Sequence, residues 1–415
     1  MRLYELERHE PLIDVQWSEE LARAAIARIA DDAHRSFGEA TLWPIHPLDR
    51  SPERPADSLK TLYFGAAGVI WALNYLDETN AIKVKRDYLA TVRKLVQRHR
   101  DDIRKYSGVR EYLGGELASY LMGETGILLL HWKMAPSEDL AQQIFAAIEA
   151  KVGDPRGLIW GAPGTMLAAL FMHECTGDPR WKKLFLDSFE ALWNQWEYEA
   201  ELRCRLWTFN LHGISEKRLG ALHGFVANAF PMIRGRHLLP PNRRDESMRR
   251  ISETLLATAL IDRAHTNWPH SVGPTTRQTS MPLLVQHCSG APGIITAMAE
   301  FPKDSRWPID AWLESAGELV WDAGPTVKLP VLCHGAAGSG YAFLKTLRAD
   351  RRKEVARPCA QICDACNRSV RSGGAETLSA QVFAVDRRLG LGDFSLGLHS
   401  GGWKISDHRC VLKSR

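Results

Sequence analysis

The 415-residue chain is short of features that would assign it to several large protein classes. It has no run of about eighteen apolar residues, which argues against a transmembrane helix, and no apolar stretch of signal-peptide type near its start. The formal net charge of +4 is spread without a basic block, so the composition gives no support for nucleic-acid binding. These absences predict a cytoplasmic globular protein with no transmembrane segment and no nucleic-acid partner.

Cysteines and strand patterns are scarce as well. Eight cysteines in a chain of this length do not make a disulfide framework, and a reducing compartment favours their use in metal binding or catalysis. Segments that alternate apolar and polar residues with β-branched enrichment are lacking, so the sequence predicts no β-sheet. The apolar content of 45% is enough to bury a large core in one or two domains.

A short phrase recurs along the chain: a few apolar residues, then Gly-x-x-Gly, then an apolar run. We call each copy a glycine turn. The first glycines of the copies are Gly65, Gly123, Gly161, Gly224 (a degenerate copy), Gly290 and Gly335. Their spacing of 38 to 66 residues can hold one helical hairpin per copy. Repetition at that scale is typical of an array or a closed ring.

Between the glycine turns, apolar residues recur at three- and four-residue spacing, which predicts amphipathic helices. The predicted helices span residues 19–37, 83–103, 138–152, 180–196 and 309–321. Ser18 and Ser137 are suitable N-caps. Each glycine turn then starts an inner helix, because glycine lets neighbouring backbones approach closely. Six or seven hairpins in a ring make an all-α fold, an α/α toroid with the glycine turns at one end. The alternative is a helical solenoid whose turns do no chemistry.

The last two glycine turns carry the residues best suited to chemistry, Cys288-Ser-Gly and Cys333-His334-Gly. A toroid would bring these turns together, so two sulfurs and an imidazole would meet at one place. Catalytic zinc takes three protein ligands and keeps a fourth position open for water or substrate. Sulfur and imidazole donors also favour zinc over magnesium or calcium. The sequence therefore predicts a Zn²⁺ site formed by Cys288, Cys333 and His334.

The order of His223-Gly, Cys288-x-Gly-Ala-Pro-Gly and Cys333-His334-Gly over six glycine turns resembles the lanthionine synthetase C-like family. The resemblance covers roughly residues 60–346. It implies an α/α toroid that holds one zinc ion through Cys288, Cys333 and His334. It also implies the addition of a thiol, from a peptide cysteine or from glutathione, to dehydroalanine or dehydrobutyrine. The product is a thioether of the lanthionine type in a modified peptide.

The resemblance implies further site residues and partners. His223 matches the histidine that the family places near the zinc and is a candidate acid for the enolate formed by addition; the alternative is a buried histidine bonded to a backbone carbonyl. Lys328 stands five residues before Cys333, as a lysine does in glutathione-using relatives. It could stabilise the enolate or bind a substrate carboxylate, or be a solvated surface lysine. The substrate would be a dehydrated peptide. An upstream dehydratase or kinase-type partner protein would supply it, because no dehydratase domain precedes the toroid.

Positions beside the first ligand cysteine depart from the family pattern. His287 stands where relatives have an aromatic residue, and we rank it second to His334 as a ligand because adjacent residues seldom face one metal. Ser289 stands where many relatives have histidine or tyrosine. The arginine that dedicated cyclases carry shortly before this cysteine is Leu284 here. These departures favour a stand-alone relative over a dedicated cyclase.

The acid that cyclases place before the third glycine turn is replaced by Gly157. Glu124, inside the second glycine turn, is either a local substitute for that acid or a helix-start carboxylate that complements the helix dipole. One alternative function is a non-catalytic zinc-containing toroid that binds peptides or glutathione. Another is a glycosidase or epimerase on the same scaffold, although glycosidases need two carboxylates around the bond and the turns offer no convincing pair.

The chain changes character after residue 346. Half of its cysteines, Cys359, Cys363, Cys366 and Cys410, lie in the last 57 residues, where helical periodicity fades. Back-translation with permitted codons, read one base later, gives LARRFAMHAIDQ from residue 358 and YSLWTGDLGLAT from residue 382. The first is an amphipathic helix and the second resembles a final glycine turn. We therefore interpret residues 1–346 as the toroid and residues 347–415 as a poorly ordered tail in which a frameshift has replaced the seventh hairpin.

Overall fold

The computed structural model describes residues 3–12, 18–45, 58–112, 117–211, 213–273, 283–304, 306–307, 309–327 and 331–350. Over these residues the chain forms fourteen α-helices and seven short strands. Residues 351–415 lie outside this range, so nearly all of the predicted out-of-frame tail, with its four cysteines and the replaced seventh hairpin, is not described. Within the described helices, none combines the length and the apolar character that crossing a bilayer requires.

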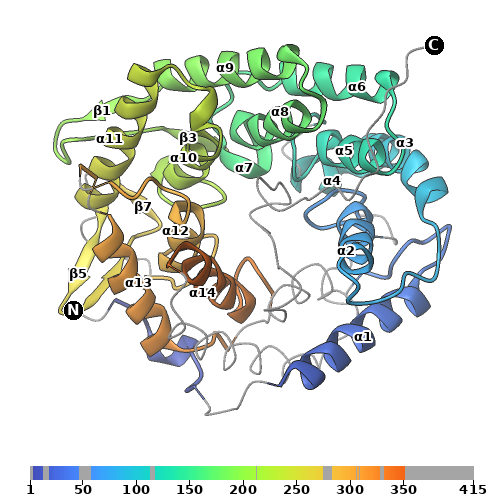
Figure 1. Ribbon diagram of the computed structural model, residues 1–415, viewed down its shortest axis with the longest axis horizontal. Helices are drawn as coiled ribbons and strands as arrows, with labels where there is room; N and C mark the ends of the chain where they lie inside the picture. The colour runs from blue at the N-terminus through green and yellow to red at the C-terminus, as the bar shows by residue number, and fades with distance from the viewer. Residues whose placement is uncertain are drawn as a thin grey trace.

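Six inner helices follow the glycine turns. They are α2 (Ala66–Glu78), α5 (Glu124–Met134), α8 (Ala162–Thr176), α10 (Phe225–Arg234), α12 (Ala291–Met298) and α14 (Ala336–Asp350). Each helix in this series packs against the next one, so that they stand side by side around a common centre (Figure 1). The prediction that every glycine turn starts an inner helix is confirmed.

Six outer helices alternate with the inner ones along the chain. They are α1 (Glu19–Ser36), α3 (Leu89–Lys105), α6 (Glu138–Glu149), α9 (Pro179–Asn194), α11 (Pro241–Thr258) and α13 (Asp310–Ala323). Figure 1 shows them outside the inner series, as an α/α toroid requires. The short helices α4 (Ser107–Tyr112) and α7 (Gly157–Trp160) belong to connections. The predicted all-α toroid with six hairpins is therefore confirmed over the described residues.

Local sequence explains where these helices begin and which face they bury. The hydroxyls of Ser18 and Ser137 accept hydrogen bonds from backbone N–H groups three residues later, at 3.2 and 3.3 Å, and so act as the predicted N-caps. On α9 the buried residues Trp181, Phe185 and Phe189 recur every four residues and form a single apolar face that packs on α8. Burying each such side chain contributes roughly 1.5–3 kcal/mol.

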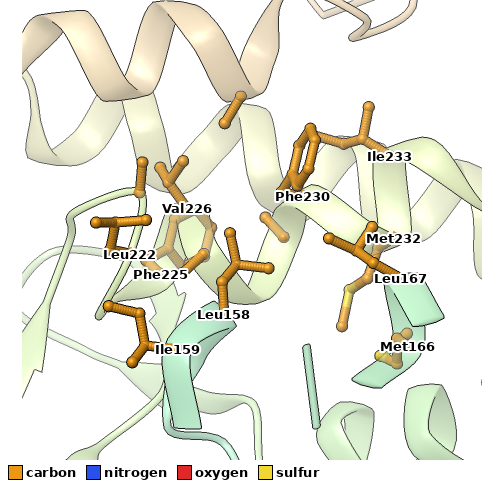
Figure 2. Packing of buried hydrophobic residues seen from close by; sticks show 14 of the residues in the cluster. Leu158, Ile159, Met166, Leu167, Leu222, Phe225, Val226, Phe230, Met232 and Ile233 are labelled. Atoms are coloured by element: carbon orange, nitrogen blue, oxygen red, sulfur yellow. The ribbon is translucent and has the colours of Figure 1, made fainter. Parts of the chain in front are cut away.

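The third and fourth glycine turns are joined by both main chain and side chains. The N–H of Leu158 donates to the carbonyl of Leu222 at 3.2 Å. Leu158 lies beside Phe225 and Val226 in the buried cluster where α7 meets α10 (Figure 2). This contact holds the turn that contains His223 in a fixed position relative to the turn before it.

The prediction that the chain contains no β-sheet is wrong. Three small antiparallel sheets occur: β1 (Glu197–Glu199) with β2 (Cys204–Leu206); β3 (Phe209–Leu211) with β4 (Ile214–Arg218) and β7 (Ser271–Val272); and β5 (Leu260–Asp262) with β6 (His265–Asn267). The strands have two to five residues, too few to give a clear alternation. No residue of β4 is fully buried, although it is the central strand of its sheet.

Residues 3–12 form an N-terminal arm that pairs with the segment leading to Cys333. The N–H of Glu10 donates to the carbonyl of Pro325 at 2.8 Å, and the N–H of Val327 donates to the carbonyl of Arg8 at 3.1 Å. Further along the chain, α1 shares a buried apolar cluster with α2. The N-terminal arm therefore contacts the segment that leads to Cys333, and α1 contacts the first inner helix.

The stability of the fold should depend on pH through His99 of α3. This side chain is buried, and its Nε2 has no hydrogen-bond partner within the part of the chain that the structure describes. Burial, assisted by the charges of Lys60 and Arg100, lowers the pKa of His99 to about 4. Because this value lies below the unfolded pKa near 6.5, stability is complete above pH 6.5 and falls as the pH drops towards 4. The linked loss is on the order of 3 kcal/mol.

We expect His99→Gln to remove this contribution. Urea unfolding between pH 6.5 and 4 should show a slope smaller by about 1.4 kcal/mol per pH unit, the linkage of one proton. Measurements at pH 8, where the native histidine is neutral, provide the baseline for the variant. An unchanged slope would mean that His99 takes up its proton as readily in the folded chain as in the unfolded one.

Candidate metal centre

Two neighbouring inner helices bring the predicted ligands together. Cys288 lies three residues before the start of α12, while Cys333 and His334 come just before α14. The N–H of Cys288 donates to the carbonyl of Cys333 at 3.2 Å, so the two glycine turns are joined through their main chains. Because α12 and α14 pack side by side, residues 45 positions apart in the sequence become neighbours.

The donor atoms have the spacing that one metal ion requires. The Sγ of Cys288 lies 3.0 Å from the Nδ1 of His334. The two sulfurs and one imidazole nitrogen of Cys288, Cys333 and His334 all lie within 4.8 Å of one another. Zinc bonds of about 2.3 Å to sulfur and about 2.0 Å to nitrogen put the donors of a tetrahedron roughly 3.5–3.8 Å apart. The three residues could therefore hold a metal ion, and their donor chemistry suits zinc.

Electrostatics favour an ionised sulfur at this centre. A hydrogen bond from Cys288 holds the pKa of the Cys333 thiol well below its usual range, and a hydrogen bond and the charge of His334 act in the same direction. Sulfur binds metals as thiolate, so this environment suits a ligand. Cys204 differs, because burial raises its pKa to about 11. None of the four described cysteines is in a disulfide.

The fourth glycine turn approaches the metal centre closely. A Cβ atom at Gly220 would lie only 2.0 Å from the carbonyl oxygen of Cys288. No other residue type could let these two backbones come so near. The turn that contains His223 is therefore held directly against the segment of Cys288.

His223 is partly buried and its ring contacts two aromatic side chains. Its ring stacks on Trp160, with centroids 4.7 Å apart and planes at 29°, and meets the edge of Phe209 at 6.1 Å. Burial, then the charges of Arg218, His270 and His334, lower its pKa to about 3, so the imidazole is neutral at pH 7. Among the described residues, its buried Nδ1 has no hydrogen-bond partner, so the alternative of a bond from this nitrogen to a backbone carbonyl finds no support.

A chain of polar side chains extends from β4 to the residue after Cys288. Arg218 forms an ion pair with Glu216, and its guanidinium lies over the ring of Phe209 at 4.7 Å. The Nε2 of His270 is 4.0 Å from a carboxylate oxygen of Glu216, and its Nδ1 is 3.2 Å from the hydroxyl of Ser289. The site thus has a polar, hydrogen-bonding side beside the aromatic rings that surround His223.

A comparison with known families agrees with this arrangement. Residues 216–390 match the family described as lanthionine synthetase C-like protein. This match covers less than half of the chain, and it agrees with the resemblance that the glycine-turn motifs predict. The matched range includes His223, Cys288, Cys333 and His334, and it extends past residue 346 into the segment that we interpret as out of frame.

Individual relatives of the family give shorter or more distant matches. Glutathione S-transferase LANCL1 from Danio rerio is 37% identical over 81 residues, 19% of this chain. That stretch spans only a fifth (20%) of the length of the relative. The structure is similar to that of nisin cyclase, with a TM-score of 0.56 and 14% sequence identity, over 90% of this chain and 98% of that chain. At this level of identity the likeness shows a common fold.

Other residues singled out in the sequence have different positions. Lys328 lies outside the described residues. His287 is buried with its ring edge-on to Tyr341 and is not part of the ligand group; burial lowers its pKa to about 4. The carboxylate of Glu124 forms a two-pronged ion pair with Arg100 of α3, at 2.7 and 2.6 Å. Glu124 is therefore engaged with an outer helix, which supports its interpretation as a helix-start carboxylate.

Gly157 occupies the place of the missing family acid and lies directly against His223. Its φ of +72° is in the left-handed region. A Cβ atom there would be 2.5 Å from the carbonyl oxygen of Leu222 and 3.2 Å from the Cα of His223. The backbone thus fills the space that a side chain would need.

Sequence reasoning missed three residues near the centre: Tyr63, Trp160 and Arg218. Trp160 precedes the first glycine of its turn, as His223 and His334 do in theirs, and Tyr63 stands two before its glycine, like the cysteine ligands. Alignment of the six turns could have found both. Arg218 lies in a strand that was not predicted, so no sequence signal indicated its position.

Proposed function

We propose that this protein catalyses zinc-dependent addition of a thiol to dehydroalanine or dehydrobutyrine residues of a peptide, forming a thioether. The observation that carries the proposal is the group of Cys288, Cys333 and His334, whose donor atoms lie within 4.8 Å of one another. A zinc ion at these residues would supply the positive charge that keeps an incoming thiol deprotonated at neutral pH. The match of residues 216–390 to the lanthionine synthetase C-like family supports the same reaction.

The side chains around this group suit the remaining steps. In the addition, a bond forms between the sulfur and the β-carbon, the double-bond electrons move towards the carbonyl, and the thiol proton ends on the α-carbon. A neutral His223 can accept that proton and later return it to the α-carbon, so one residue carries the proton between the two atoms. Arg218 can donate hydrogen bonds to the enolate oxygen as charge develops there.

Exposed apolar residues at the glycine-turn end suit a peptide substrate. The side chains of Phe64, Leu117 and Val327 are 51%, 42% and 51% exposed, although each is large and apolar. A dehydrated peptide could pack on them while its double bond reaches the centre. We further propose that the peptide comes from an upstream dehydratase or kinase-type partner, and that the reaction occurs in the cytoplasm, where cysteines stay reduced.

The test is a direct assay of the purified protein. Zinc content is measured first, and the protein is then incubated with a dehydroalanine peptide and glutathione. Thiol addition raises the peptide mass by the mass of glutathione, and a peptide with an internal cysteine tests cyclisation, which leaves its mass unchanged but blocks alkylation. A zinc-loaded protein that modifies neither peptide above the uncatalysed rate would contradict the proposal.

The alternative is a non-catalytic zinc-containing toroid that binds peptides or glutathione. The observation that favours it is Gly157, where dedicated cyclases carry an acid and this chain has no space for one. Binding of the dehydrated peptide without turnover would support this alternative. If His223→Asn loses activity that the wild-type protein has, while its peptide binding is unchanged, the non-catalytic alternative is excluded.

Arg218 gives a prediction that is specific to this chain. Arg218→Gln removes the positive charge but keeps a hydrogen-bond donor, and we expect kcat/KM for thiol addition to fall about 10- to 100-fold, the value of one charge-assisted hydrogen bond. Arg218→Lys should recover part of the loss. Arg205→Gln, which alters an arginine stacked on Tyr198 at 5.5 Å, is the control. Equal rates for wild type and Arg218→Gln would remove this residue from the reaction.

A further inference from the structure

Asn267, the last residue of β6, is fully buried, and both ends of its carboxamide are hydrogen-bonded. Its Oδ1 accepts from the N–H groups of Ala291 and of the residue that follows Asn267, both at 2.9 Å. Its Nδ2 donates to the carbonyl of Leu284 at 3.2 Å and to that of Leu3, in the N-terminal arm, at 2.9 Å. One side chain therefore joins the arm to both ends of the segment that contains Cys288.

This side chain takes the place of a main-chain bond that other glycine turns make. In the first and second turns, the first N–H of the inner helix donates to the carbonyl seven residues earlier, at 2.8 and 2.6 Å. The corresponding pair in the fifth turn is the N–H of Ala291 and the carbonyl of Leu284. There the carboxamide of Asn267 bonds to each of the two groups. The N-terminus of α12 is thus capped by a side chain from a strand 24 residues earlier.

The backbone of the fifth turn differs from that of the first two in the same place. Gly290 has a φ of +107°, in the region that favours glycine, whereas Gly65 and Gly123 have −137° and −133°. Cys288 lies only two residues before Gly290, so the conformation of this turn sets the position of its sulfur. That sulfur lies 3.0 Å from the Nδ1 of His334.

We propose that Asn267 is a positioning residue of the metal centre, whose carboxamide holds the fifth turn in the conformation that presents Cys288 to the metal. This inference rests on the proposed function, because it assumes that Cys288 is a metal ligand. Groups that orient the ligands without touching the metal typically contribute about 10- to 100-fold to its affinity. Without the carboxamide, the N–H of Ala291 and the carbonyl of Leu284 must pair directly or lose their partners, and either outcome changes the segment that holds the sulfur.

Asn267→Ala tests the proposal because it removes the carboxamide alone. We expect zinc affinity, measured by competition with a chelator, to fall about 10- to 100-fold. With saturating Co²⁺ in place of zinc, the sulfur-to-cobalt absorption band should lose intensity, because Cys288 is held less firmly. In the metal-free protein, alkylation of Cys288 should become about tenfold faster relative to the exposed Cys175, as mass spectrometry of the peptides can show. Zinc affinity within twofold of wild type and an unchanged band would overturn the proposal.

Asn228→Ala is the matched control. Asn228 is an equally buried asparagine on the inner helix α10, and its side chain donates to the carbonyl of Pro155 at 3.1 Å. Both variants should lose stability, but Asn228→Ala should keep the zinc affinity and cobalt band of wild type. Equal weakening of zinc binding in the two variants would indicate a general loosening of the fold and would overturn the proposal.

The outcomes distinguish this inference from the proposed function. If wild-type protein binds no zinc, the proposed function fails, and an unchanged alkylation rate of Cys288 in Asn267→Ala would overturn the role of Asn267 as well. If wild type binds zinc and Asn267→Ala binds it equally well, only the role of Asn267 fails.

Discussion

Replacing Cys333 by alanine is expected to abolish both zinc binding and thiol addition. The variant keeps two of the three donors, Cys288 and His334, and a structural or catalytic zinc ion is rarely held by fewer than three protein ligands. We expect metal analysis of purified Cys333→Ala to find no stoichiometric zinc. The rate of glutathione addition to a dehydroalanine peptide should fall to that of the uncatalysed reaction.

The matched control for this variant is Cys175→Ala. Cys175 is exposed near the end of α8 and is not part of the ligand group. This variant should retain zinc and activity at wild-type levels. Circular dichroism of Cys333→Ala distinguishes loss of metal from loss of the helical fold. Wild-type zinc content in Cys333→Ala would exclude Cys288, Cys333 and His334 as the ligand set and would remove the main support for the proposed function.

The second large effect is expected at His223. Asparagine is smaller and has no basic nitrogen, so His223→Asn cannot carry the proton from thiol to α-carbon. General acid–base catalysis typically contributes about 10²- to 10⁴-fold, and we expect kcat to fall by a factor in this range. Zinc content and peptide affinity should remain close to wild type, because His223 is not one of the proposed ligands.

Stopped-flow or quenched single-turnover measurements separate the chemical step from product release in this variant. Trp160→Phe is a useful control, because a phenyl ring can still stack on His223 and should retain most of the activity. If His223→Asn loses zinc together with activity, the residue acts through the metal centre and not through proton transfer. If the variant keeps full activity, another group moves the proton.

The helical part of the fold could be predicted because its signals are local and repeated. The six glycine turns and the apolar spacing of segments such as 138–152 and 180–196 indicate hairpins, and the structure confirms them. The strands β3, β4 and β7 could not be found in this way. They are short and largely polar, and they are held by main-chain pairing between residues such as Arg218 and Ser271 that lie far apart in the sequence.

The ligand residues could be predicted because they belong to the repeated glycine turns. Cys288 and Cys333 stand at equivalent places of two adjacent repeats and His334 follows Cys333, so packing α12 against α14 brings the three residues together. The surroundings of the ligands depend on contacts across the ring. The N-terminal arm, for example, pairs with residues 325–327, more than 300 residues later in the sequence. No local pattern in the sequence specifies such contacts.

The tight packing of Gly157 against the neighbouring turn limits which side chains could be introduced at this position. A carboxylate introduced at that position would have to displace the carbonyl of Leu222 and adopt a backbone angle that L-amino acids avoid. A Gly157→Asp substitution alone is therefore not expected to add a carboxylate beside His223 without moving the main chain. An acid at this place would need further changes in the turn around Leu222 to make room for it.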